Sequence, residues 1–206
     1  MNRTEILNRL VEIAPGAINT FTKPGQPHCV MATTIGQMVL NHFGVESFPY
    51  PVEVRITNKA WADWATAGYG GGRAEQERRG AYLLSNTPNF NGASFKTVEV
   101  AKPWDGHLVL RVPGGKGKPA WIVDLDMGSF NRPQHGIMLP DGLLAELSSD
   151  GRLAGTLVAS DAIQTTVEYR PLVASYRDDY QTSKDWVERD RLIGHVNELA
   201  RAIRGG

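Results

Sequence analysis

Apolar side chains recur at helical spacing in several parts of the chain. The stretch RTEILNRLVEIA predicts an amphipathic helix over residues 3–14, which the following Pro-Gly pair would end. The pattern CVMATTIGQMVLNHFG predicts another helix over residues 29–44, with Cys29 in its first turn. A further amphipathic helix is predicted over residues 183–204.

Between these helices, apolar and polar residues alternate with the period of β-strands. The clearest segments are residues 95–100, 107–112 and 120–127, followed by two runs within 156–173. The turn-forming sequence PGGKGKP joins the second and third segments, which predicts a hairpin. Helices, then antiparallel strands, then a final helix indicate an α+β fold in a single domain, residues 1–206.

Proline and glycine punctuate the remaining segments. FPYPVEVRI (48–56) contains two prolines and then alternates, which favours an extended segment or an edge strand. Residues 59–84 predict helical pieces around a glycine-rich loop. That loop is interpreted as a surface loop, because no strand precedes it and no Gly-Lys-Ser/Thr follows it. DGLLAEL (141–147) is interpreted as a short helix or turn.

Composition narrows the class of protein. Lys plus Arg and Asp plus Glu both number 22, so the net charge of zero gives no sign of a nucleic-acid or membrane-surface partner. No apolar run approaches the length of a membrane span, and the charged start lacks the apolar core of a signal peptide. A single cysteine cannot form an intramolecular disulfide and fits a reducing compartment. The expectation is a cytoplasmic protein whose oligomeric state stays open.

The one cysteine, Cys29, stands where a polar loop meets a helix. The thiolate is the nucleophilic form, and a helix N-terminus, a nearby imidazolium and partial exposure all favour it. The unpaired N–H groups of the first helical turn can also hold a developing oxyanion, and Gln26 is a candidate second donor. The alternative is a packed apolar residue, which is the commonest role of a free cysteine.

A nucleophilic cysteine needs a base, and the chain has 5 histidines. His28 is interpreted as a loop residue, because its side chain should point away from the cysteine beside it. His42 shares the apolar face of its predicted helix and should be packed in the core or in an interface, whereas His195 should be solvated in the last helix. His135 lies in the loop NRPQHG and can line a cleft.

The fifth histidine, His107, opens a predicted strand shortly after Trp104. A hairpin centred near Lys116 brings either Asp124 or Asp126 directly across from it, with Cβ atoms about 4.5–5.5 Å apart. That separation allows a hydrogen bond from imidazole to carboxylate, which fixes the tautomer and stabilises the imidazolium. The alternative is a surface histidine beside an acidic strand end.

This order of residues resembles the papain-like cysteine enzyme superfamily, in particular its transglutaminase-like and arylamine N-acetyltransferase branches. There, a helix-starting cysteine is followed by a histidine on a strand and an aspartate on the next strand. WIVDLDMG (121–128) is similar to the acetyltransferase pattern, which favours Asp124 over Asp126. The resemblance covers residues 22–140, but KPGQPHC replaces the Arg-Gly-Gly-Cys of the acetyltransferases, which argues against coenzyme A as donor.

The resemblance implies a papain/transglutaminase-like α+β fold, with the nucleophile helix packed on an antiparallel sheet or partial barrel. It implies a hydrolase or acyltransferase that acts on an amide, isopeptide or thioester bond of a peptide, protein or small acyl substrate. Cys29 would form the thioester, His107 would be the base and Asp124 would orient it, without a metal or cofactor. Oxyanion or substrate contacts are expected from Gln26, Trp104, Asp126 and His135.

Two other functions stay open. An acetyl-coenzyme A-dependent N-acetyltransferase would need a nucleotide-binding groove. A non-catalytic protein-binding module on the same fold could use Trp61, Trp64 and Tyr69 as its partner surface, although such aromatics more often belong to a core.

Overall fold

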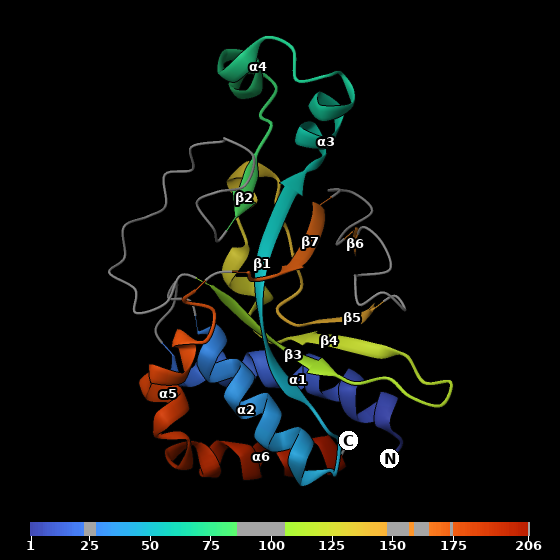
Figure 1. The fold of residues 1–206 in the computed structure, drawn as a ribbon, viewed down its shortest axis with the longest axis vertical. Helices are drawn as coiled ribbons and strands as arrows, with labels where there is room; N and C mark the ends of the chain where they lie inside the picture. The colour runs from blue at the N-terminus through green and yellow to red at the C-terminus, as the bar shows by residue number, and fades with distance from the viewer. Residues whose placement is uncertain (23–27, 86–105, 148–156, 159–164, 174, 206) are drawn as a thin grey trace.

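A computed structural model describes the chain at residues 1–22, 28–85, 106–147, 157–158, 165–173 and 175–205 (Figure 1). Its helices are α1 (Arg3–Phe21), α2 (Cys29–His42), α3 (Lys59–Thr66), α4 (Gly72–Arg78), α5 (Lys184–Val187) and α6 (Ile193–Gly205). Its strands are β1 (Phe48–Asn58), β2 (Leu83–Ser85), β3 (His107–Val112), β4 (Ala120–Asp124), β5 (Leu143–Leu147), β6 (Leu157–Val158) and β7 (Thr165–Pro171). The predicted α+β class is confirmed, while the predicted strand at 95–100 lies outside the described residues.

The long strand β1 organises a 7-stranded antiparallel sheet of order β5-β4-β3-β1-β7-β6, with β2 also paired to β1. The prediction of an extended segment for residues 48–56 is confirmed, but the edge-strand alternative is wrong, because β1 lies between β3 and β7. β1 tolerates Pro49 and Pro51 because their backbone nitrogens, which carry no hydrogen, point away from β3. On that side β7 begins to pair only at Val52.

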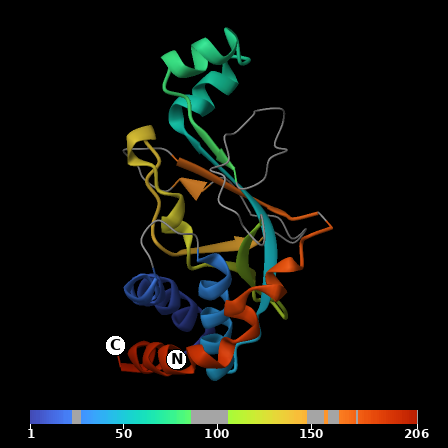
Figure 2. The same ribbon diagram turned by 90° about the vertical axis from the view of Figure 1, so that its left-hand side faces the viewer.

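Helices α1 and α2 cover one face of the sheet, and α6 packs behind them (Figure 2). The core between these layers includes Leu7, Leu10, Ile35, Leu40 and Leu110. A second core on the other face of the curled sheet includes Val54, Val109, Ile122, Ile137 and Tyr169. The strand β3 is thus buried on both faces, which explains why four of the six residues of HLVLRV are apolar.

The prediction that the first helix ends at its Pro-Gly pair is wrong, because α1 continues through Pro15. Proline here deprives the Val11 carbonyl of its usual donor. That carbonyl lies against Gly142, where a Cβ would collide with the Val11 oxygen. Buried Ala14 and Ile18 extend the apolar stripe, and this packing outweighs the cost of about 3 kcal/mol for proline inside a helix.

Two strand assignments also differ from expectation. Residues 141–147 contain β5 instead of a short helix or turn, and every second residue of β5 is buried. The strand predicted over 120–127 ends at Asp124, because Met127–Phe130 form a 3₁₀ turn. The hairpin of β3 and β4 itself is confirmed.

The C-terminal region is not the single helix predicted over residues 183–204. It consists of α5, a 3₁₀ turn at Arg189–Leu192 and α6. The break lets Trp186 pack against the small apolar cluster that contains Cys29, while α6 packs on α1 and α2. None of the helices in the described part of the chain has the length and apolar composition needed to cross a membrane.

Helices α3 and α4 form an arm that projects beyond one end of β1 (Figure 1). Asn58 caps α3 through its side-chain oxygen, which accepts the Trp61 N–H at 2.9 Å. The rings of Trp61, Trp64 and Tyr69 meet edge to face. Both tryptophans are buried and hold the arm together, so the expectation that they belong to a core is confirmed, whereas Tyr69 is exposed.

Candidate active site

The helix α2 begins at Cys29 itself, as the sequence predicts. The backbone N–H of the preceding residue, His28, donates to Asp126 Oδ2 at 2.9 Å. This bond ties the entry of the helix to the end of β4. Cys29 is 7% exposed, and its buried neighbours include Leu172 and Tyr180.

Two contacts fix α2 against the hairpin. Thr33 Oγ1 donates to the Leu108 carbonyl at 2.8 Å, one turn along from the cysteine. At Gly36, an added Cβ would lie only 2.7 Å from a methyl group of Leu125, so the helix approaches the sheet closely there. The position of the thiol is therefore set by a hydrogen bond and by the small size of a glycine.

On the neighbouring strand, the His107 ring is held by a carboxylate. His107 Nε2 and Asp124 Oδ2 lie 2.7 Å apart. The same oxygen accepts the Tyr169 hydroxyl at 2.7 Å, and Asp124 Oδ1 accepts the Asp126 backbone N–H at 3.0 Å. The hairpin register places Asp126 across from His107 and Asp124 on the diagonal, so both carboxylates lie on the histidine's face.

The thiol and the imidazole meet. The side-chain ligand atoms of Cys29, His107 and Asp126 all lie within 4.8 Å of one another, and the nearby thiol adds to the rise in the pKa of His107. Because Asp124 occupies Nε2, the nitrogen left for the sulfur is Nδ1. The Phe130 ring packs edge-on against the imidazole, with centroids 5.0 Å apart.

Burial and charge act in opposite directions on this pair. Burial lowers the pKa of His107, but the charge and hydrogen bond of Asp124 outweigh it, with a smaller contribution from Cys29, and the pKa lies well above its usual value. Burial raises the pKa of Asp124, but the His107 charge and the hydrogen bonds from His107, Tyr169 and the Asp126 backbone lower it on balance. The arrangement therefore favours an imidazolium held by a carboxylate.

Two further groups respond to the same charges. Burial, followed by the charge of Asp124 and the hydrogen bond to it, raises the pKa of Tyr169 well above its usual value, so its hydroxyl remains a donor. Burial raises the pKa of Asp126 to about 6, with Asp124 adding to the effect while His107 and the His28 N–H oppose it. Asp126 is thus a second carboxyl group near the thiol, and its pKa is raised whereas that of Asp124 is lowered.

The remaining predicted site residues lie elsewhere. Gln26 and Trp104 are outside the described residues. His135 stacks on Tyr82, with ring centroids 3.8 Å apart, and its carbonyl accepts the Asn58 side chain. No contact between His135 and the cysteine is found among the described residues.

The sequence pattern does not single out Tyr169, the donor to Asp124, as a site residue. The alternation of the predicted strand at its position places it on the same face as Val167, which is buried in the second core. That signal predicts burial, but the bond to Asp124 joins residues 45 positions apart and depends on how β7 pairs with β1.

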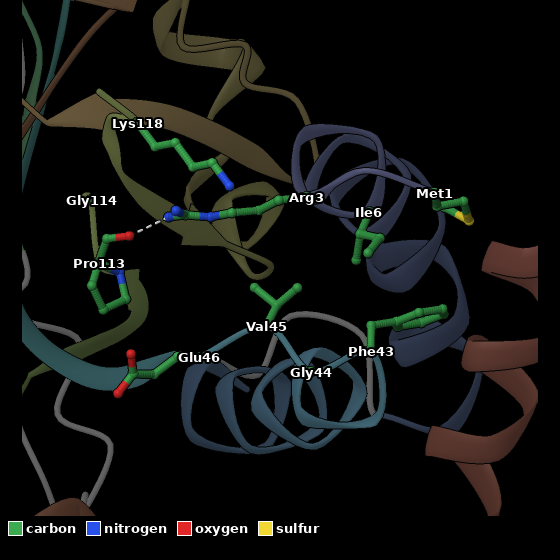
Figure 3. A pocket seen from close by; sticks show the side chains of 10 residues that line it. All are labelled: Met1, Arg3, Ile6, Phe43, Gly44, Val45, Glu46, Pro113, Gly114 and Lys118. Carbon is green, nitrogen blue, oxygen red and sulfur yellow. Dashed lines mark hydrogen bonds between the residues drawn. The ribbon is translucent and has the colours of Figure 1, made fainter. Parts of the chain in front are cut away.

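A cavity of about 410 Å³ lies at the opposite end of α2 from Cys29 (Figure 3). The helix α2 spans about 21 Å, so the cavity is separate from the group formed by Cys29, His107 and Asp124. Arg3 crosses it and donates to the Pro113 carbonyl, beside Lys118 and Phe43. The cavity therefore contributes nothing to the chemistry of the cysteine.

Comparison with protein-family models, with curated proteins and with solved structures finds no match to this chain.

Proposed function

We propose that this protein is a cysteine-dependent hydrolase or acyltransferase of papain/transglutaminase-like architecture, acting on an amide, isopeptide or thioester bond. The observation that carries the proposal is one connected chain of contacts. Cys29, the first residue of a helix, lies within 4.8 Å of the His107 ring, whose Nε2 is held by fully buried Asp124. The order and placement of these residues support the resemblance drawn from the sequence.

The chemistry follows from this arrangement. His107 accepts the Cys29 proton at Nδ1, and the thiolate attacks the substrate carbonyl carbon to form a C–S bond. The oxyanion lies next to the N–H groups of the first turn of α2, which lack intrahelical acceptors. The imidazolium then protonates the leaving amine, alcohol or thiol, which departs and leaves a thioester.

The second half of the reaction regenerates the thiol. Water or an acceptor amine gives a proton to His107 while it attacks the thioester carbonyl. The C–S bond breaks, and the proton on the imidazolium returns to the sulfur. Throughout, Asp124 remains ionised and keeps the ring in one orientation.

The test is formation of an acyl-enzyme. The protein is mixed with p-nitrophenyl esters, peptidyl aminomethylcoumarin amides, acyl thioesters and acetyl-coenzyme A, quenched in acid, and its intact mass is measured. We expect an adduct of one acyl group on Cys29, absent in Cys29→Ala, whose folding is confirmed by circular dichroism. His42→Gln, at the far end of the same helix, is the control that keeps the adduct.

The outcomes separate the alternatives. An adduct formed only with acetyl-coenzyme A would favour the N-acetyltransferase. A partner that binds wild type and Cys29→Ala equally, with no adduct from any acyl donor, would favour the binding module and contradict the proposal.

A further inference from the structure

The acyl chemistry proposed above does not use Asp126, and this residue suggests a second function for the group of side chains around Cys29. Asp126 is 8% exposed and lies beside the thiol and the imidazole. Two carboxylates and one thiol thus surround a single imidazole in a region of low exposure. When both carboxyl groups and the thiol are ionised, a single imidazolium balances only one of their three negative charges, and buried charges need a partner.

The three side chains supply suitable donor atoms. We propose that Cys29, His107 and Asp126 bind Zn²⁺, which switches the enzyme off reversibly. The inhibitory part of this inference rests on the proposed function; the binding part does not. Thiolate, imidazole and carboxylate are the three ligand types that zinc takes in proteins, and a fourth position would stay open for water.

The spacing fits such a site after small side-chain rotations. In tetrahedral coordination, the edges between sulfur, nitrogen and oxygen ligands measure about 3.3–3.6 Å. The ligand atoms of Cys29, His107 and Asp126 already lie within 4.8 Å of one another. The His28 N–H uses Asp126 Oδ2, which leaves Oδ1 as the oxygen to face the metal.

The outer contacts of His107 are those of a zinc-binding histidine. Such a histidine usually donates its second ring N–H to a carboxylate, which fixes the tautomer and increases ligand basicity. Asp124 performs this function at Nε2 and is itself held by Tyr169 and by the Asp126 N–H. Nδ1 is thereby left for the metal, just as it is left for the thiol proton.

Metal binding and acyl chemistry exclude each other at this site. The metal would occupy the sulfur lone pair that attacks the carbonyl and the nitrogen that accepts the thiol proton. On binding, the proton that Cys29 and His107 Nδ1 share is released to solvent, which leaves a thiolate and a neutral imidazole as ligands. A chelator reverses both effects.

The test measures binding without relying on activity. Metal-free protein competes with a chromophoric chelator for Zn²⁺, and Co²⁺ is added separately to detect the near-ultraviolet band of a cobalt–thiolate bond. We expect Cys29→Ala and Asp126→Asn each to weaken Zn²⁺ binding at least about 100-fold, since loss even of an outer-shell partner costs about 10–100-fold. Cys29→Ala should also abolish the cobalt band, and His42→Gln should change neither measurement.

A second readout links the metal to the thiol. Zn²⁺ should slow alkylation of Cys29 by iodoacetamide in the wild type, and EDTA should restore it. Zinc affinity unchanged in both Cys29→Ala and Asp126→Asn, or no affinity in the wild type, overturns the zinc site. An acyl adduct on Cys29 in that case would leave the proposed function standing. Zinc binding with the expected variant dependence, but without any acyl adduct, would support the zinc site and contradict the proposed function. Should Asp126→Asn fail to fold, Cys29→Ala and the cobalt band decide alone.

Discussion

The two ends of α2 offer a direct comparison. At the N-terminal end, Cys29 meets His107, which is 2% exposed and bonded to a buried carboxylate. At the C-terminal end, His42 is exposed and accepts a hydrogen bond from Arg204 beside an open cavity. A histidine lies at each end of α2, but only His107 has its charge and orientation fixed by buried partners.

The difference shows that the cavity and the candidate Cys-His-Asp triad lie at opposite ends of the helix. The cavity has space and exposed polar groups, but its histidine neighbour is solvated. The Cys29 end has little exposed area and a connected set of hydrogen bonds. Nucleophile activation needs the second arrangement, because a base works only when a partner holds its tautomer and stabilises its charge.

The largest effect should come from Asp124→Asn, which removes the charge that distinguishes the two ends. The variant leaves His107 buried without its counter-charge, and breaking a buried pair costs about 3–5 kcal/mol. Acyl transfer should fall about 10⁴-fold, because the imidazole adopts the wrong tautomer. Urea unfolding and adduct formation measure the two effects; His42→Gln should stay within about 0.5 kcal/mol of wild type.

Asp126 should make the free energy of unfolding depend on pH, and Asp126→Asn should lack this dependence. Both proteins are measured with a chelator present. Its pKa is raised from 3.8 to about 6 in the folded protein. A group with a raised pKa contributes stability that is complete below the unfolded value and is lost as the pH rises through the folded value. Two pKa units correspond to about 3 kcal/mol.

The window for Asp126 therefore runs from about pH 4 to pH 7. Across it, the free energy of unfolding of the wild type should fall by about 3 kcal/mol relative to Asp126→Asn. Urea titrations of both proteins at several pH values measure this difference. A difference that does not vary with pH would show that Asp126 is not held in the buried environment described here.

A smaller effect is expected from Tyr169→Phe, which removes one donor from Asp124 and leaves the histidine contact. A hydrogen bond to a charged group contributes about 1.5–3 kcal/mol, so urea unfolding should show a loss in that range. Tyr82→Phe, which keeps its ring stack on His135, is the matched control with little change. Equal losses in both variants would contradict a specific role for the Tyr169 hydroxyl.

The smallest effect compares alanine at two helical glycines. At Gly36, the new methyl group meets Leu125 and Leu110, and overpacking costs about 1–3 kcal/mol. At Gly16 nothing lies within 4 Å, so the higher helix propensity of alanine should stabilise the protein by up to about 1 kcal/mol. Thermal unfolding should shift in opposite directions; a stabilised Gly36→Ala would mean that α2 does not approach the hairpin closely.

Local patterns predicted much of the site. The start of α2 at Cys29 and the hairpin of β3 and β4 follow from short-range periodicity and turn residues. Geometry alone leaves the choice between Asp124 and Asp126 open, because a shift of one residue either way from the expected hairpin register places one or the other opposite His107. The structure shows that both lie beside His107 and that Asp124 makes the hydrogen bond.

Long-range packing decided what the sequence missed. Helical spacing places His42 on the face of Ile35, and the expectation that it packs in the core is wrong, because the last turn of α2 leaves it exposed beside Arg204. Pro15 stays within α1 because of a glycine that is distant in sequence, Gly142. Neither contact leaves a local signal in the sequence.

The most direct test of an activated thiol is its alkylation rate in metal-free native protein. Iodoacetamide should modify Cys29 near neutral pH, as seen by intact mass, and Asp124→Asn should slow this reaction strongly while the unfolded chains of both proteins react alike. A native wild-type protein that resists alkylation, although its unfolded chain is alkylated readily, would show that the thiol is merely packed and not a nucleophile.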